Sequence, residues 1–524
     1  NNNALENANN EQNLDDNDQI ASNNLAEKKS DTKTESLNQT NKKLLDPTRN
    51  GLVLLTIRLI LTLFSQRSYI HPDEFFQGVE IIAGDLFNCG DKIHRAWEFN
   101  FNRINSTQTL QEPIRNMAIP YFFYGIPLAI LKYFSSLGSI RDYTLGTANQ
   151  HELNILTVSS NTLIFYPRCF MILCSFIIDI VLFNLADFCD LDNSSVLLTF
   201  ASSYIAMVYL TRTFSNSVET ILFSIFVYLI IKSIKSQYIL NDKFLIESSN
   251  QQRNKTIRRV LSSTNNELKI NNNNKLYSNN NNNNHNNNES ISGGSSMLSS
   301  TIKRLRLFDI YRFDYLGDSI GLVLAIGVFN RPTFLIYAFV PTFYWLFYGL
   351  ENCNSFYQIM VYIIRRLITL SRLFIPFTIF FILFDTVYFY RLRSFPELYD
   401  HITHRDLIIT PYNFFIYNTN PDNLRQHGEH PFYQHILNCF LLFGLNQLIV
   451  LIAILQFGFQ SYSILSQRIL VEGNPSIANR KRSWSFKAKE KLLNLYKYLI
   501  NNLFCFFVLV FVVPLFVFSF ISHK

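Results

Sequence analysis

The stretch "GLVLLTIRLILTLFSQRSYIHPDEFFQGVE", residues 51–80, decides the fold prediction. It begins with an apolar run over residues 51–66, and two adjacent carboxylates, Asp73 and Glu74, follow soon after the run ends. A helix that crosses a lipid bilayer needs about 20 mostly apolar residues. The run therefore predicts a membrane-spanning helix, and the carboxylates are expected at a membrane–water boundary.

Apolar runs of similar length recur along the chain and predict an all-α polytopic membrane protein with about ten or eleven transmembrane helices. Residues 317–350 are too long for one span and contain Pro332, so we expect two short helices that meet at "NRP". Residues 152–166 are a weaker candidate, which would partner a span over 168–188. The other predicted spans are 117–136, 195–211, 216–232, 373–390, 436–458 and 498–522.

The composition supports this class and divides the chain. Of the 524 residues, 48% are hydrophobic and 16% are charged, whereas soluble domains carry about 25% charged residues. Residues 1–45 and 241–300 are Asn-rich and are predicted to be disordered. They separate a first membrane part, 46–240, from a second one, 301–524. The first part includes the polar loop 67–116, where we expect the chemistry.

The net charge of +7 has a membrane explanation. Lys and Arg cluster in the links between apolar runs, as they do in cytoplasmic loops, so we predict no nucleic-acid partner. The basic segments 233–316, 361–372 and 480–497 are therefore placed in the cytosol. Counting the predicted spans between these segments, with 152–166 included, then puts the polar motifs together on the opposite side: "HPDEFFQ", "RAWEF", "PIRN", "YPR", "RTFSNS", "NRPTF" and the loop 391–435.

Cysteine and histidine spacing predicts no metal site. The seven cysteines form no CxxC pair. The segment 410–435 contains His427, His430 and His435, but not at the HExxH spacing of a zinc site. We read it as a non-periodic loop whose histidines, with Asn413 and Asn418, either hydrogen-bond a carbohydrate or phosphate or are ordinary loop residues.

The "HPDE" motif has two readings. Pro72 suits the first position of a helix, and Asp73 and Glu74 would then lie in the first turn, where the positive helix end favours acids. Alternatively, a carboxylate at this boundary accepts the proton of a sugar hydroxyl that attacks an activated donor. The motif alone leaves both readings open.

Three arginines have similar alternatives. Arg212, in "RTFSNSVET", either reaches for lipid headgroups from an interfacial turn or binds substrate. Arg331, in "NRPTF", is either an anchor or a phosphate ligand, since the guanidinium fork matches phosphate oxygens. Arg58 lies within an apolar run, where a charge is costly, so we expect it to face protein.

The motifs in this order resemble the dolichyl-phosphate-mannose-dependent mannosyltransferases of the GT-C superfamily, glycosyltransferase family 22. Within that family the resemblance is to members that add a fourth mannose to the glycosylphosphatidylinositol (GPI) precursor. It rests on "YIHPDEFFQ" (69–77), "WEF" (97–99), "PIRN" (113–116), "PR" (167–168), "YLTRTFSNSVET" (209–220), "GVFNRPTF" (327–334), "FDTVYF" (384–389) and "TPYNFFIYNTNPDNLRQHGEHP" (410–431).

The resemblance implies a GT-C type helical bundle in the endoplasmic reticulum membrane with a lumenal active site. It implies an inverting α-1,2 transfer of mannose from dolichyl phosphate mannose to the third mannose of the GPI precursor. No cofactor or metal is expected, and the partners are the lipid-linked donor, the acceptor glycolipid and membrane lipids. Asp73 is the implied catalytic carboxylate, with Glu74 beside it. The candidate substrate-binding residues are His71, Gln77, Arg115, Arg212, Asn216, Arg331, Asn413, His427 and His430.

Two departures and three alternatives accompany this interpretation. The chain ends "SHK" where family members continue with an "HQEPRF"-like motif, so we expect a truncated C-terminus, and Asn116 stands where many members carry Ser. The alternatives are another mannosyltransferase with the same donor, such as the third-mannose enzyme, a transporter of lipid-linked sugar, and a non-catalytic subunit. A transporter needs no acidic pair at a helix start, and inverted repeats would favour it.

Overall fold

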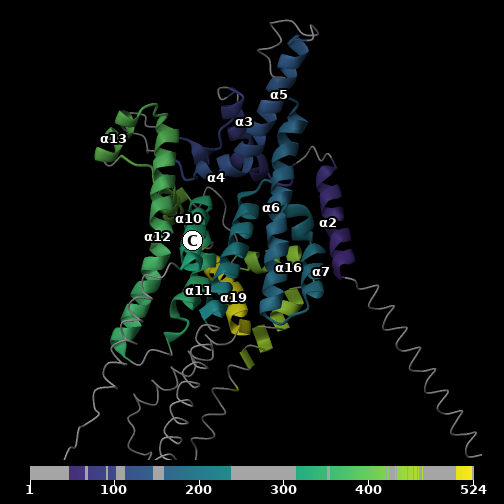
Figure 1. Ribbon diagram of the computed structural model, residues 1–524, viewed down its shortest axis with the longest axis vertical. Helices are drawn as coiled ribbons and strands as arrows, with labels where there is room; N and C mark the ends of the chain where they lie inside the picture. The colour runs from purple at the N-terminus through teal and green to yellow at the C-terminus, as the bar shows by residue number, and fades with distance from the viewer. Residues whose placement is uncertain are drawn as a thin grey trace, which may run out of the picture.

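The computed structural model describes residues 47–64, 69–89, 93–101, 112–144, 158–237, 314–350, 355–404 and 406–420, parts of 422–463, and 503–521. The predicted disordered segments 1–45 and 241–300 lie outside these residues, as do His427 and His430. Within the described residues every regular element is helical and no strand occurs (Figure 1). The all-α class is confirmed, and the number of spans stays a prediction.

Among the described residues, three helices are long and apolar enough to cross a membrane: α6 (Ser160–Phe188), the helix Ser215–Gln237, and α12 (Phe356–Tyr390). They differ in how much of their apolar surface the protein covers. In the most apolar window of Ser215–Gln237, 61% of the residues are buried, against 11% in α12. Ser215–Gln237 is therefore a central helix, whereas α12 turns most of its surface outward.

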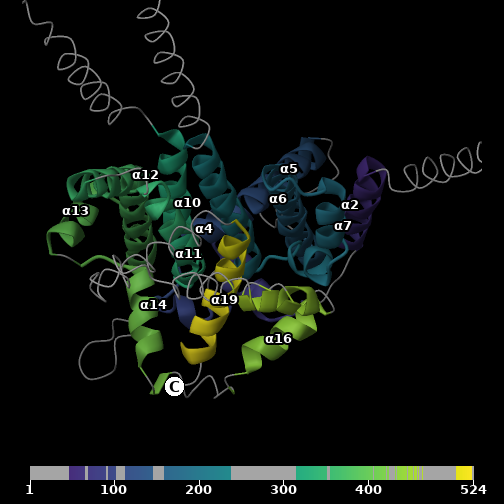
Figure 2. The ribbon, with the colours of Figure 1, turned by 90° about the horizontal axis from the view of Figure 1, so that it is seen from below.

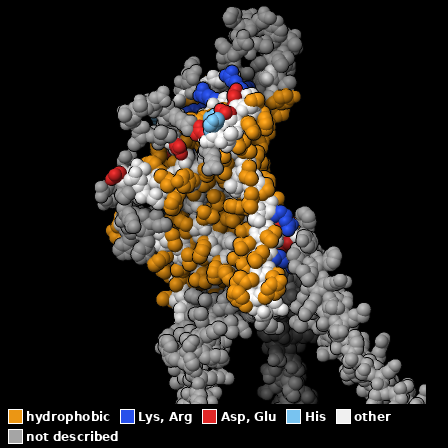
Figure 3. Space-filling view, turned by 90° about the vertical axis from the view of Figure 1, so that its left-hand side faces the viewer, with side chains coloured by type: hydrophobic (Ala, Val, Ile, Leu, Met, Phe, Trp, Pro, Cys, Tyr) orange, Lys and Arg blue, Asp and Glu red, His pale blue; other side chains and the backbone are white. Residues whose placement is uncertain are grey.

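The shorter helices are arranged around this frame. Seen from below, α10 (Tyr315–Asn330) and α11 (Phe334–Phe347) lie near the centre with α19 (Leu503–Ile521), and α2 (Pro47–Leu63) lies at the far side from α12 (Figure 2). Hydrophobic side chains cover much of the face that carries α12, and charged side chains gather toward its upper end (Figure 3). Further labelled helices are α3 (Glu80–Leu86), α7 (Asn193–Ala201), α13 (Phe395–Thr403), α14 (Thr410–Thr419) and α16 (Gln434–Phe443).

The predicted span 117–136 is helical, with a π-turn inside it, and whether it crosses a membrane stays a prediction. This region forms α4 (Ala118–Pro120), the π-helix η3 (Tyr121–Gly125) and α5 (Ile126–Thr144). α5 is not among the helices apolar enough to cross a membrane, and it rises beyond the upper ends of α6 and α12 (Figure 1). The three elements follow one another without a gap, so residues 118–144 form one continuous helix with a π-turn inside it, and Pro120 and Pro127 do not end it.

The predicted break between 152–166 and 168–188 is wrong. A single helix, α6, begins after Ser159, whose hydroxyl accepts a hydrogen bond from the Thr162 amide. Pro167 lies inside α6 without ending it, as neighbouring helices often permit in membrane proteins.

Other boundaries follow the sequence more closely. Residues 317–350 form α10 and α11 with a break at 331–333, as predicted. The basic link 361–372 is helical and belongs to α12, and the predicted loop 391–435 contains α13 and α14. The predicted span 436–458 divides into α16 and the apolar helix Gln447–Gln456 at Gly444, whose φ of +54° suits glycine.

Close backbone contact joins α10 to α12. A Cβ added at Gly321 would lie 2.1 Å from the Leu370 carbonyl oxygen, so only glycine permits this approach. Small residues at such interfaces let membrane helices pack by van der Waals contact. At the other side of the bundle, Arg58 of α2 donates to both carboxylate oxygens of Asp179 in α6, at 2.7 and 3.2 Å. The expectation that Arg58 faces protein is confirmed.

We expect Arg58→Leu to destabilise the protein by about 3–5 kcal/mol, because it leaves the Asp179 carboxylate without its ion-pair partner. The double variant Arg58→Leu/Asp179→Leu removes both charges and should recover most of that loss. The melting temperature of the detergent-purified protein measures the effect. Equal melting of the single and double variants would contradict this account.

Candidate functional site

The buried carboxylate of Glu74 joins three sequence motifs. Its Oε1 accepts hydrogen bonds from Arg168 Nε at 2.8 Å and from Arg212 Nη1 at 3.4 Å. Its backbone carbonyl accepts one from the Thr213 hydroxyl at 2.9 Å. Glu74 is fully buried, and both arginines are nearly so. The network therefore fixes "HPDE" against α6 and against the turn that precedes Ser215–Gln237.

The neighbouring carboxylate of Asp73 is exposed. About half of its side chain, 47%, is open to solvent. Its amide donates to His71 Nδ1 at 3.3 Å, and that nitrogen lies 3.4 Å from Asp73 Oδ1. A helix begins here after Pro72 and continues as the π-helix η1 (Phe75–Val79), so the helix-start reading of "HPDE" is confirmed. That reading leaves Asp73 available for chemistry.

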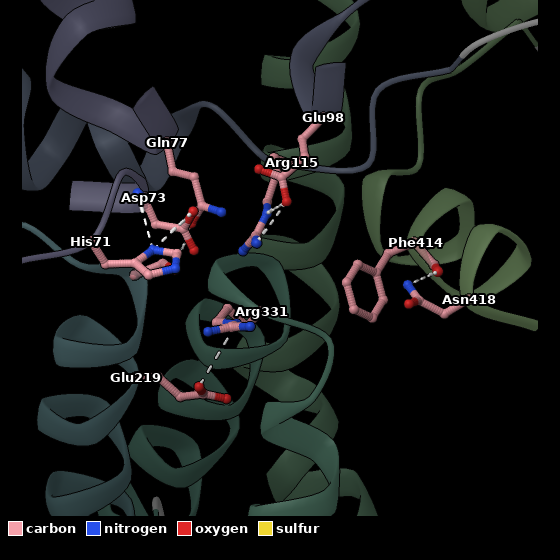
Figure 4. Close-up of polar contacts among 10 residues, drawn as sticks. His71, Asp73, Gln77, Glu98, Arg115, Glu219, Arg331, Phe414 and Asn418 are labelled. Atoms are coloured by element: carbon pink, nitrogen blue, oxygen red, sulfur yellow. Dashed lines mark hydrogen bonds and ion pairs between the residues drawn. The ribbon is translucent and has the colours of Figure 1, made fainter. Parts of the chain in front are cut away.

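Gln77 lies on the same side as Asp73 and faces the start of the central helix (Figure 4). Its Oε1 accepts from the Ser215 hydroxyl at 3.4 Å, and the Ser215 carbonyl accepts from Asn330 Nδ2 at 3.1 Å. These residues line a small pocket together with Arg115 and Asn116. The "HPDEFFQ", "PIRN", "RTFSNS" and "NRPTF" motifs therefore meet at one place.

Arg115 is held by an acid that the sequence analysis did not select. Its Nε and Nη2 donate to Glu98 Oε1 at 3.2 and 3.0 Å, and only 9% of its side chain is exposed. Glu98 belongs to the short 3-10 helix Trp97–Phe99, and its carbonyl accepts from the Ile114 amide. The Arg115 Nη1 has no hydrogen-bond partner among the described residues.

Arg331 lies below Arg115, with Glu219 beneath it (Figure 4). The Arg331 Nε is 3.9 Å from Glu219 Oε2 and makes no hydrogen bond with the described residues. Glu219 Oε1 instead accepts from the Thr333 hydroxyl at 3.0 Å. Arg115 and Arg331 thus each present one buried, unpartnered N–H, which makes the space between them a candidate anion site.

A cavity of about 350 Å³ opens beside Arg331. It lies between Ser215–Gln237, α11, α16 and α19, and its wall is polar near Arg331 and Glu219 and aromatic farther away. The predicted substrate-binding residue Asn216 lines this cavity rather than the pocket at Arg115. The other lining residues are Thr220, Phe223, Thr333, Tyr337, His435 and Phe518.

Helix α14 contacts the segment that carries Arg115. Asn413 is buried and donates from Nδ2 to the Pro113 carbonyl at 3.0 Å, whereas Asn418 bonds the Phe414 carbonyl within its own helix. Phe414 points toward the arginines (Figure 4). The Tyr417 ring packs against Trp97 at 4.7 Å between ring centroids, with the two planes tilted by 32°. Burial, together with the nearby charge of Glu98, raises the pKa of the Tyr417 phenol, so it stays neutral.

The structure changes the meaning of several predicted residues. Arg212 belongs to the Glu74 network, and Asn413 acts on the backbone of "PIRN". Glu98, Arg168 and Glu219 were missed, although each lies in a motif that the sequence analysis quoted. The sequence signal that could have identified them is that each has a charge opposite to that of a residue in another quoted motif. Across the described ranges, no group of three or more His, Cys, Asp or Glu is placed to hold a metal ion.

Comparisons with known proteins give a consistent result. The model of the Alg9-like mannosyltransferase family matches residues 51–524. "GPI mannosyltransferase 4" of Drosophila melanogaster is 27% identical over 382 residues, 73% of this chain and 46% of that protein. "GPI alpha-1,2-mannosyltransferase 4" of Homo sapiens is 27% identical over 395 residues, 75% of this chain and 50% of that protein. The chain thus spans about half the length of these curated relatives. No solved structure gives a significant match.

Truncation of the two carboxylates of "HPDE" should affect the stability of the protein to very different extents. Glu74→Ala leaves Arg168 and Arg212 without their shared acid and should cost about 3–5 kcal/mol of stability. Asp73→Ala removes an exposed group and should change stability by no more than about 0.5 kcal/mol. Melting temperature and the yield of monodisperse protein measure both. Equal losses in the two variants would show that the Glu74 network does not hold the fold.

Proposed function

The chain belongs to the Alg9-like mannosyltransferase family, and we propose that its site transfers the fourth mannose of the GPI precursor. In this proposal dolichyl phosphate mannose is the donor, and the third mannose of the precursor receives the sugar in α-1,2 linkage. The names of the curated relatives support this choice over the third-mannose reaction. The site would lie on the lumenal side of the endoplasmic reticulum membrane, in a bundle of about ten or eleven spans.

One observation supports the catalytic assignment above the others. Of two adjacent carboxylates, Glu74 is fully buried between arginines, while Asp73 is half exposed and faces the region of Gln77 and Arg115 (Figure 4). A general base must reach the proton that it removes. Only Asp73 meets that requirement, so the proposal gives it the catalytic role and gives Glu74 a structural one.

The proposed reaction is an in-line substitution. The 2-hydroxyl of the acceptor mannose attacks the anomeric carbon from the face opposite the dolichyl phosphate, and Asp73 accepts the hydroxyl proton. The bond between the anomeric carbon and the phosphate oxygen breaks, and dolichyl phosphate leaves with the electron pair. The β-linked donor therefore gives an α-linked product. A positioned base contributes about 10²–10⁴ to the rate of such steps.

The departing phosphate needs cationic donors. In the proposal Arg115 and Arg331 supply them, because each has an unpartnered N–H while Glu98 and Glu219 hold the side chains in place. Donors fixed before the reaction stabilise developing charge without reorganisation. The cavity beside Arg331 is lined on other sides by Tyr337 of α11 and Phe518 of α19. The donor and the arginines together suffice for this chemistry, and the proposal includes no metal or cofactor.

We expect Asp73→Ala to abolish transfer while the protein still folds. The variant and wild type are expressed in cells that lack their own fourth-mannose activity, and GPI precursors labelled with mannose are separated by size. Wild type should convert the three-mannose precursor to the four-mannose form, and Asp73→Ala should not.

Asp400→Ala is the matched control, because Asp400 is also an exposed aspartate that lies beside a histidine, at 3.2 Å from His404 Nδ1. It should convert the precursor normally. Conversion by Asp73→Ala would show that the residue only starts a helix. If wild type instead restores cells that lack their own third-mannose activity, the third-mannose reaction is favoured.

Arg115→Lys and Arg331→Lys should each lower kcat/KM for the donor by about 10²-fold or more, since one donor to a developing anion is worth about that much. Lysine keeps the charge but not the two-pronged guanidinium geometry. Microsomes with a synthetic dolichyl phosphate mannose series measure the effect. Arg391→Gln, at an exposed arginine after α12, should retain wild-type kinetics. Unchanged kinetics in both lysine variants would remove the arginines from the site.

A further inference from the structure

Helix α12 carries one acidic residue, Asp385, near its upper end. The Asp385 side chain is completely buried. All three of its hydrogen bonds among the described residues come from neutral donors. Oδ2 accepts from Asn116 Nδ2 at 2.9 Å and from the Thr410 hydroxyl at 2.8 Å, and Oδ1 accepts from the Met117 amide at 3.0 Å.

The burial of the Asp385 carboxylate within an apolar helix calls for a physical explanation. A charged group within an apolar helix is costly and usually marks a functional position. Packing alone does not explain Asp385, because its neighbour Thr386 already holds the same region with a hydroxyl that accepts from the Ile408 amide at 3.1 Å. What the carboxylate adds is simultaneous contact with two segments, 116–117 and 410, that are far apart in the sequence.

Both segments border the proposed site. Asn116 and Met117 directly follow Arg115, and Thr410 begins α14, which turns Phe414 toward the arginines (Figure 4). The Asn413 amide closes the arrangement from the other side through the Pro113 carbonyl. The short segment 113–117 is thus clamped at both ends, and Arg115 projects from its middle.

We propose that Asp385 is a positioning residue for mannose transfer: it clamps the "PIRN" segment to α14 and thereby fixes the guanidinium of Arg115 at the donor phosphate. This inference rests on the proposed function. Asp385 touches neither substrate nor reacting atoms and acts through Asn116 and Met117. Hydrogen bonds to charged groups are individually strong and directional. A carboxylate therefore fixes the position of segment 113–117 more rigidly than a neutral acceptor does.

An exchange of side chains tests the inference. Asp385→Asn places an amide N–H opposite the Asn116 amide, and Asn116→Asp places two carboxylates opposite each other. Either single change should lower kcat/KM for the donor by about tenfold to hundredfold. The double variant Asn116→Asp/Asp385→Asn restores complementary donors and acceptors, and it should return kcat/KM to within about threefold of wild type. In each single variant, the fold-increase in KM for the donor should exceed the fold-decrease in the amount of folded protein.

Asp318→Asn is the matched control, since Asp318 is a buried carboxylate of α10 that accepts from Arg372 Nη1 at 3.1 Å. It should leave the kinetics of transfer unchanged. Hydrogen exchange of the peptide 112–120 gives a second readout that needs no substrate. Exchange should accelerate in both single variants and return to the wild-type rate in the double variant.

Three results would overturn the inference. They are wild-type kinetics in Asp385→Asn, an equal deficit in the single and double variants at normal protein levels, and reduced protein with unchanged kinetics per molecule. Wild-type protein that transfers no mannose would instead contradict the proposed function and the catalytic part of the inference. The exchange rates would still decide whether the clamp exists.

Discussion

The ion pairs of Glu74 with Arg168 and Arg212 hold the site end of this molecule together. They connect a residue that follows the first apolar helix with α6 and with the turn before the central helix. A carboxylate fully removed from solvent is costly unless it is paired and hydrogen-bonded, so the folded arrangement is closely specified. Because successive residues of a helix point about 100° apart, burial of Glu74 turns Asp73 outward. The exposure of the proposed base is thus a consequence of the buried acid beside it.

Other arginines of the protein also pair with acids, but the number and closeness of their contacts differ. Arg58 and Asp179 form a bidentate pair away from the polar end. Glu98 accepts two hydrogen bonds from Arg115, whose Nη1 has no hydrogen-bond partner among the described residues. Arg331 is held more loosely, at 3.9 Å from Glu219. The arginines that border the site are therefore oriented by acids without being neutralised by close contact. Such fixed, incompletely satisfied donors suit an anion that develops during a reaction.

Irregular helix geometry is concentrated next to the polar motifs. The π-helices η1 and η3 follow "HPDE" and "PIRN", and η5 (Ile205–Tyr209) precedes Arg212. A π-turn inserts a residue into a helix and is frequent at functional sites. Asp385 meets one of these segments from α12, which links the outermost long helix to the site.

The sequence by itself determined the helical class, because apolar runs that approach the thickness of a bilayer are long enough to identify, and it located the break at "NRP", because proline cannot continue a helix. It also placed Asp73 and Glu74 at a helix start. The break expected between 152–166 and 168–188 was wrong, since Pro167 is tolerated within α6.

Only the tertiary structure decided which carboxylate is buried. Arg168 and Arg212 lie 94 and 138 residues from Glu74 in the chain, so no local pattern reveals the pairing. The partners of Arg115 and Asp385 were hidden for the same reason. Local sequence specifies helix starts and apolar faces through short-range backbone and solvent effects. Ion pairs between distant segments exist only after packing has brought those segments together and has excluded water from them.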